Sequence, residues 1–210
     1  MAQNNIKPLV EVSGEGIVRV VPDEVTINLR VENTGDNAKE LKRTNDRIVN
    51  EVLSFIKSQD IEDKYVKTEY IRLSKNYDYK TKSYNYAANQ SISVKLTDLS
   101  KYETLMNGLL ESGINRIDGI SFSTSERQAL ESDARKRAVA HAKLKAEEYA
   151  GVLNQGIGKA VSIRENVNFS PPSPVLRQAM AMDSSGGGEQ TMAPGEMEVR
   201  VTVYISFELL

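Results

Sequence analysis

Few residues in this chain could carry nucleophilic, acid–base or metal chemistry. It contains no cysteine and a single histidine, His141. Without cysteine, the chain cannot form a disulfide, a thiol nucleophile, an Fe–S cluster or a Cys/His zinc site. A Ser-His-Asp triad would have to use His141 as its base. Because this histidine lies between Ala140 and Ala142 in a predicted helix, we interpret it as a packed or surface side chain.

The common phosphate-binding and nucleophile motifs are also missing. Gly151 and Gly156 have the spacing of a Walker A pair, but Ile157 occupies the position of the required lysine. Gly156 and Gly158 lack the third glycine of a dinucleotide-binding fingerprint, because Val161 occupies its position. No Gly-x-Ser-x-Gly sequence occurs. Paired carboxylates occur on a predicted helix, where they are most simply solvated. We therefore predict no catalytic, cofactor-binding or metal-binding residues.

Tyrosine is the residue type with an unusual distribution. Six of the nine tyrosines lie between residues 65 and 86. The four that flank the tip of a predicted hairpin are Tyr77, Tyr79, Tyr84 and Tyr86. Because tyrosine offers a large contact area at a low entropic cost, it is enriched in protein interfaces. These four residues therefore predict a protein contact, and packing between the two strands of the hairpin is the alternative.

Composition is typical of a globular domain and excludes some partners. The chain has 210 residues, of which 40% are hydrophobic and 27% are charged, and its formal net charge is −2. A near-neutral charge does not attract nucleic acid or an anionic membrane, and nothing else basic accompanies the lysines near the tyrosines, Lys75, Lys80 and Lys82. No apolar run approaches the roughly 18 residues of a membrane-spanning helix. We predict neither a nucleic-acid partner nor a transmembrane segment.

The hydrophobic pattern predicts hairpins alternating with helices. The expected elements are strands 9–21 and 25–31, a helix over 37–59, strands 65–75 and 84–97, a helix over 100–113, a strand over 114–122, a helix over 125–153, and strands 160–167 and 199–208.

The three predicted helices have recognisable starts. Asn37 with Glu40 and Ser100 with Glu103 have the spacing of a capping box, and Ser125 with Gln128 begins the third helix.

Gly14 and Gly16 share the apolar phase of the first strand, which indicates a bulge, a bend or a close backbone approach. The last helix repeats a small residue at every fourth position, a spacing that permits close contact with a helix or sheet. These residues are Ala134, Ala138, Ala142 and Ala146.

The element order ββαββαβαββ contains more hairpins than βαβ crossovers. It predicts an α+β fold with largely antiparallel sheets and helices packed on one face. The order is loosely palindromic, so residues 1–63 and 125–210 are expected to form the main domain. Residues 64–124 would then be an inserted subdomain. The Pro-, Gly- and Ser-rich residues 168–195 are predicted to form a mobile loop.

Several segments resemble one protein family along nearly the whole chain. The sequences VSGEG at residues 12–16 and VPD at residues 21–23 resemble the opening signature of the SIMPL-domain proteins. Later matches are YNYAANQ at 84–90, the helix over 134–150 with GKA at 158–160, and PGE at 194–196 with SFEL at 206–209. Asn85 departs from the family, which more often has glycine at this turn. The family includes bacterial periplasmic immunogens and envelope proteins linked to oxidative-stress tolerance.

This resemblance implies an α+β protein that is periplasmic, secreted or associated with the outer membrane of a bacterium. It allows assembly into large rings or barrels, and it offers no agreed catalytic residues. Residues 1–3 have neither the basic nor the apolar region of a signal peptide. The start is that of a native cytosolic protein or of a mature chain from which a signal peptide has been removed, and the resemblance implies the second.

We expect a non-enzymatic cell-envelope protein that acts as a homo-oligomeric scaffold or as a stress-protective factor. The alternative is a module that binds a small ligand or a partner protein, in a pocket between the two sheets or through residues 168–195. A third hypothesis is an enzyme that uses only carboxylates and Ser or Thr hydroxyls. Methionines in or near the predicted loop suggest an oxidant sink, and they are Met180, Met182, Met192 and Met197.

Overall fold

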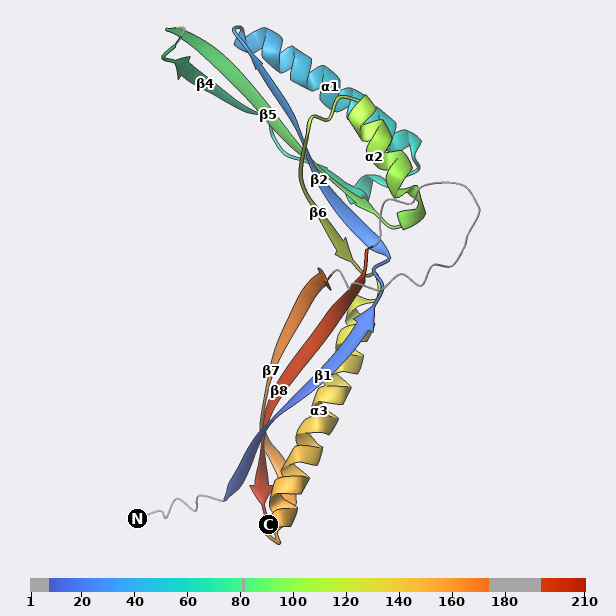
Figure 1. The fold of residues 1–210 in the computed structure, drawn as a ribbon, viewed down its shortest axis with the longest axis vertical. Coiled ribbons are helices and arrows are strands. Elements are labelled where there is room, and N and C mark those ends of the chain that lie inside the picture. The colour runs from blue at the N-terminus through green and yellow to red at the C-terminus, as the bar shows by residue number, and fades with distance from the viewer. Residues whose placement is uncertain (1–7, 81, 174–193) are drawn as a thin grey trace, which may run out of the picture. The chain divides into compact units, whose positions relative to one another are not determined.

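The computed structural model describes residues 8–80, 82–173 and 194–210, and it confirms the predicted α+β class with largely antiparallel sheets (Figure 1). The expected strand over 65–75 is divided into two strands in the structure, and the other predicted elements are found with shifted ends. The elements are β1 (Leu9–Val20), β2 (Glu24–Gly35), α1 (Ala38–Ser58), β3 (Val66–Thr68), β4 (Arg72–Asp78), β5 (Ser83–Leu96), α2 (Tyr102–Glu111), β6 (Arg116–Ser123), α3 (Arg127–Val152), β7 (Ile157–Ser173) and β8 (Glu196–Leu209), with short 3₁₀ turns at Asp63–Tyr65 and Leu99–Lys101.

The described chain forms two compact units whose boundaries differ from those expected from the sequence. The first unit contains β1, α3, β7 and β8, and the second spans Asp23–Ser125. β2 and α1 thus belong with the middle of the chain and not with its two ends. The expected hairpin between β1 and β2 does not form, because β1 pairs with β8 whereas β2 pairs with β5 from Val25 to Gly35. Strand alternation alone does not identify the partner of a strand.

The first unit is a three-stranded antiparallel sheet with the order β1-β8-β7 and α3 packed on one face. β8 supplies half of the buried core residues of this unit, because every second residue points toward the helix, as the strict alternation predicted. The buried residues of this strand are Met197, Val199, Val201, Val203, Ile205 and Phe207. The four alanines of α3 that were singled out by their spacing are completely buried against this sheet.

Gly14 and Gly16 are required by the closeness of α3 to β1. A Cβ atom added at Gly14 would overlap the carbonyl oxygen of Ala138, and one added at Gly16 would overlap that of Ala134. The obstructing atoms belong to helix backbone, which cannot move aside as a side chain can. Of the three interpretations of the two glycines, the close backbone approach is the one observed. The small residues of α3 form the other side of this contact.

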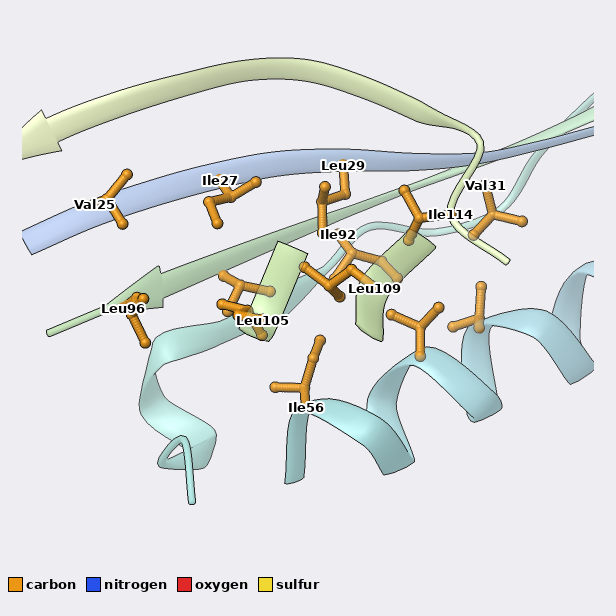
Figure 2. Packing of buried hydrophobic residues seen from close by; sticks show 13 residues of the cluster. Val25, Ile27, Leu29, Val31, Ile56, Ile92, Leu96, Leu105, Leu109 and Ile114 are labelled. Atoms are coloured by element: carbon orange, nitrogen blue, oxygen red, sulfur yellow. The ribbon is translucent and has the colours of Figure 1, made fainter. Parts of the chain in front are cut away.

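The second unit has a five-stranded sheet with the order β3-β5-β2-β6, in which β4 also pairs with β5. α1 and α2 pack on one face of this sheet. Figure 2 shows the apolar side chains of β2 and β5 that meet those of the two helices. The labelled members of this core are Val25, Ile27, Leu29, Val31, Ile56, Ile92, Leu96, Leu105, Leu109 and Ile114.

Helix starts are predicted correctly at one place and wrongly at another. The side chain of Asn37 accepts hydrogen bonds from the backbone N–H groups of Lys39 (3.0 Å) and Glu40 (3.2 Å), so it caps α1 as expected. Before α2, the cap is the side chain of Asp98, which accepts from the backbone N–H of Ser100 at 3.0 Å. The chain makes a 3₁₀ turn there before α2 begins at Tyr102.

Ser125 does not cap α3, because it bonds to Asp23. The carboxylate of Asp23 accepts hydrogen bonds from the backbone N–H of Ser125, at 2.8 Å, and from its hydroxyl. Burial works against ionisation of Asp23, but these hydrogen bonds outweigh it and hold the pKa of the carboxyl below its ordinary value. The two ends of the second unit are thereby tied together at the VPD sequence that the family resemblance had singled out.

Two predicted loops contain more strand than expected. β7 extends to Ser173, so the first six residues of the predicted 168–195 loop continue a strand. Residues 174–193 lie outside the described residues, and the prediction for them stays untested. β4 extends to Asp78 and β5 begins at Ser83, so the polar loop expected between the arms of the second hairpin is shorter. Strand pairing therefore continues into part of each segment that was predicted to be a loop.

Candidate functional site

The tyrosine-rich tip belongs to the β4–β5 hairpin, where the two strands bring three aromatic rings together. Tyr77 lies directly opposite Tyr84, and the centroids of their rings are 4.9 Å apart. The ring of Tyr79 lies edge-on to that of Tyr77 at a centroid distance of 5.0 Å. Both separations fall in the favourable range for aromatic pairs. Packing across the hairpin, the alternative reading of these tyrosines, is therefore present.

The same rings are exposed, although they pack against each other. Tyr77 is 41% exposed, Tyr84 is 56% exposed and Tyr79 is 85% exposed. Tyr86 is half-buried and pairs with Lys75, whose ammonium lies 4.0 Å from the centroid of the Tyr84 ring. A cation over an aromatic face is a favourable contact, and it keeps the charged group close to the rings. The tip thus presents an exposed surface that is both aromatic and cationic.

These tyrosines continue the face of the sheet that carries the core. Side chains two residues apart along a strand share a face, so Tyr84 and Tyr86 lie on the same face of β5 as Ile92. Ile92 packs in the core beneath α1 and α2, whereas the tyrosine end of this face is exposed. We define the tyrosine strip as Tyr77, Tyr79, Tyr84 and Tyr86. It lies at an uncovered end of the face that carries the core, and Figure 1 shows its hairpin at one end of the sheet.

His141 lies on the exposed side of α3, against the outer edge of β1. Its Nδ1 atom accepts a hydrogen bond from the backbone N–H of Glu15 at 3.1 Å. One helical turn away on either side, Arg137 and Lys145 each donate to a backbone carbonyl oxygen of β1 at 2.8 Å. The two acceptors are Ile17 and Ser13. The sequence reasoning missed this set, although the spacing of three basic residues at i, i+4 and i+8 could have indicated it.

The first sheet also carries a candidate binding site. On the face of the first sheet away from α3, a shallow groove of about 230 Å³ is lined by Glu11, Ser13, Arg164, Tyr204 and Ser206, among others. In the part of the chain that the structure describes, no group of three or more histidine or acidic residues is placed to hold a metal ion. None of the described helices is long and apolar enough to cross a membrane.

The hypothesis that methionines in or near residues 168–195 act as an oxidant sink is wrong for Met197. Met197 was grouped with exposed methionines, but it is only 5% exposed because its side chain points into the core from β8. Met180, Met182 and Met192 lie outside the described residues. Their role as an oxidant sink stays a prediction.

Comparison with known proteins identifies the class to which this fold belongs. The SIMPL family, described as a protein of unknown function (DUF541), matches residues 10–207. The chain therefore belongs to the SIMPL family, and the resemblance seen in the VSGEG and VPD sequences is confirmed.

Individual relatives cover most of the chain. The chain is 28% identical over 205 residues to the uncharacterized protein YggE of Escherichia coli K12, which covers 96% of this chain and 83% of the relative. It is 27% identical over 210 residues to the 26 kDa periplasmic immunogenic protein of Brucella melitensis, covering 95% of this chain and 84% of the relative. YggE of Edwardsiella ictaluri is 26% identical over 182 residues, covering 85% and 76% of the two chains.

Proposed function

We propose that this protein is a non-enzymatic component of the bacterial cell envelope that self-associates through the tyrosine strip. The observation that carries the proposal is the uncovered end of the core-bearing face at the β4–β5 tip. Interfaces are enriched in tyrosine, and residues that carry much of the binding energy are commonly tyrosine, tryptophan or arginine. In this reading, a second copy buries the strip and the protein serves as a scaffold, or protects the envelope against stress in assembled form.

The exposed area of the strip is large enough to matter energetically. The exposed fractions of Tyr77, Tyr79 and Tyr84 together correspond to nearly two complete tyrosine side chains. At roughly 200 Å² for each side chain, this is about 350 Å² of surface. Burial at about 25 cal/mol per Å² would contribute up to about 9 kcal/mol before the costs of association. The strip therefore fits the centre of an interface, which surrounding contacts would enlarge.

The proposed location is the periplasm or the outer membrane. It is supported by the printed name of the Brucella relative, which describes that protein as periplasmic. Fractionation of the native bacterium with an antibody against this chain tests the location. Recovery with periplasmic or outer-membrane markers is expected, and recovery with cytoplasmic markers alone would overturn this part of the proposal.

The experiment that tests self-association compares solution masses by light scattering after size exclusion. The variant replaces all four residues of the tyrosine strip with serine, and Tyr70→Ser is the control, because Tyr70 is 99% exposed but lies outside the strip. We expect a discrete assembly for the wild type and for the control, and a smaller species for the fourfold variant. An assembly that the fourfold variant retains unchanged would refute the role of the strip.

The groove on the first sheet favours a second candidate function, a small-ligand binding module. Its volume of about 230 Å³ lies below the roughly 300–1,000 Å³ of typical small-molecule sites, so it suits a small polar ligand at most. Tyr204 and Arg164 provide an aromatic surface and a cation at this groove. A wild-type protein that is monomeric at all concentrations would favour this candidate over the scaffold.

A further inference from the structure

The two edge strands of the three-stranded sheet differ in whether side chains bond to their outward-facing backbone groups. An edge strand exposes unpaired backbone N–H and C=O groups, to which another strand can pair. On β1, the side chains of Arg137, His141 and Lys145 bond to three successive outward-facing backbone positions. The middle of the β1 edge, from Ser13 to Ile17, is therefore closed. Among the described residues, the opposite edge strand, β7, pairs only with β8.

The direction of the free groups on β7 follows from the hydrogen bonds of β1. Ser13, Glu15 and Ile17 direct backbone groups away from β8, because α3 side chains bond to them there. In an antiparallel ladder, alternate residues bond to the partner strand, so the odd-numbered residues of β8 bond to β1 and the even-numbered ones to β7. Backbone bonds at the strand end agree: Leu209 donates to Pro8, and Leu210 exchanges bonds with Gly156.

The same alternation assigns the free groups of β7. Between Ser162 and Ser170, β7 is in continuous register with β8, and each even-numbered residue lies opposite an even-numbered one. The odd-numbered residues of this stretch therefore point their N–H and C=O groups outward. These residues are Ile163, Glu165, Val167 and Phe169. At about 3.4 Å per residue, the regular stretch offers a pairing edge of about 30 Å.

The other described edges are poorer templates for pairing. β3 is only three residues long. β6 has a register shift against β2 where Gly119 follows Asp118. Short edge strands and bulges are both devices that prevent edge-to-edge pairing. β4 belongs to the hairpin that carries the tyrosine strip. β7 therefore keeps an edge outside the proposed interface that is regular from Ser162 to Ser170.

A second copy of β7 is the partner that fits this edge. Pairing of β7 with β1 of another copy would build an open-ended array, but the α3 side chains occupy that edge. Pairing of β7 with β7 is self-complementary and closes with two-fold symmetry. The stretch from Ser162 to Ser170 carries only two charged residues, Arg164 and Glu165, which are of opposite sign. Ile163 is 60% exposed and would gain apolar contact.

We propose that two copies of this protein pair antiparallel through β7, joining their three-stranded sheets into one six-stranded sheet. The closed β1 edge restricts growth of the sheet to this one pairing. This contact is separate from the tyrosine strip and does not depend on it. Together, two different self-complementary contacts on one chain would generate an assembly larger than a dimer.

Single cysteines test the pairing cleanly, because the chain has none of its own. The even-numbered β7 residues would face each other in non-hydrogen-bonded pairs, whose Cα atoms lie about 4.5 Å apart, a distance that a disulfide can span. The variants are Ser162→Cys, Arg164→Cys, Asn166→Cys and Asn168→Cys, oxidised alone and in mixed pairs. Ser13→Cys on the closed β1 edge is the control.

We expect at least one β7 variant or mixed pair to form a covalent dimer with at least tenfold higher yield than Ser13→Cys. If every β7 variant stays monomeric, the proposal is overturned, whatever the reason that the β7 edge does not pair. A stronger cross-link between β7 and β1 cysteines than between β7 cysteines would also overturn it.

A proline placed on the edge tests whether backbone pairing is responsible. Ile163→Pro removes an outward N–H group and leaves the bonds to β8 in place, whereas Ile163→Ala keeps that group. In the best cross-linking background, Ile163→Pro should lower the yield at least tenfold with an unchanged circular dichroism spectrum, and Ile163→Ala should retain most of it. An equal yield in both would contradict β-strand pairing.

The same cross-linking in the fourfold serine variant of the tyrosine strip separates the two proposals. A β7 cross-link that persists there supports the edge pairing independently of the strip. A cross-link that disappears shows that the β7 contact depends on the strip, and this inference then fails.

Discussion

Replacing Gly14 with alanine should destabilise the first unit strongly, because helix backbone occupies the space of the new methyl group. The added Cβ would overlap the carbonyl oxygen of Ala138 and the backbone nitrogen of Ala142. Overpacking of a core commonly costs 1–3 kcal/mol, and the upper end of about 3 kcal/mol applies where backbone must move. Gly16→Ala meets Ala134 in the same way and should behave alike.

Gly119→Ala is the matched control, because an added Cβ atom there would have no heavy atom within 4 Å. Gly119 lies in a strand as Gly14 does, but in the second unit, so its variant reports the effect of adding a methyl group to a strand glycine where there is space.

The assay is urea unfolding followed by far-UV circular dichroism, with the wild type and the three variants at equal concentration. With a slope of about 2 kcal/mol per M, a loss of 3 kcal/mol moves the midpoint of the first unit down by about 1.5 M. Gly119→Ala should stay within about 0.5 kcal/mol of the wild type. Gly14→Ala with a midpoint equal to that of Gly119→Ala would refute the close packing of α3 on β1.

Two further predictions follow from the hydrogen bonds of the chain. Asp23→Asn should lower stability by about 1 kcal/mol near neutral pH, because the bonds from Ser125 favour the ionised carboxylate. Since the pKa is lowered in the folded state, the stabilisation is present above the unfolded value of about 4 and is lost as the pH falls through the folded value. Urea midpoints of wild type and variant from pH 7 to pH 2 should therefore converge in acid, and a constant difference would contradict this. Removing the side chains that close the β1 edge, with Arg137→Ala and Lys145→Ala together, should increase aggregation measured by light scattering. Aggregation equal to that of an exposed-lysine control, Lys136→Ala, would count against the edge-closing role.

Local patterns in the sequence were sufficient for the elements but not for their partners. The alternation in β8 and the cap at Asn37 depend on neighbouring residues, and both appear in the structure as predicted. The pairing of β1 with β8 joins the two ends of the chain, and no local pattern encodes a contact of that separation. The domain boundary that was expected at residue 63 rested on the loosely palindromic order of the elements, which does not say which strands pair.

The glycines of β1 and the alanines of α3 show that a long-range contact can be indicated by small residues in each of its two segments. Gly14 and Gly16 in one strand, and small residues at every fourth position of α3, each indicated a close approach without naming its partner. The structure shows that the two patterns belong to the same contact between β1 and α3. This also gives a physical reason for the glycines in the VSGEG sequence of this chain.

The candidate site was only partly predictable. The clustering of tyrosines in the sequence indicated the β4–β5 tip, but their exposure and their place on the core-bearing face required the structure. The sequence did not single out the basic residues of α3. Their bonds to β1 depend on the angle at which the helix crosses the strand edge, which the sequence pattern does not determine.

The central claim is that the protein associates with itself, and sedimentation velocity of the unmodified chain tests it most directly. The mass should be measured over a hundredfold range of concentration in the low micromolar region and above. We expect a discrete species of at least two copies that becomes more populated with concentration. A single species with the mass of one 23.3 kDa chain throughout would contradict it.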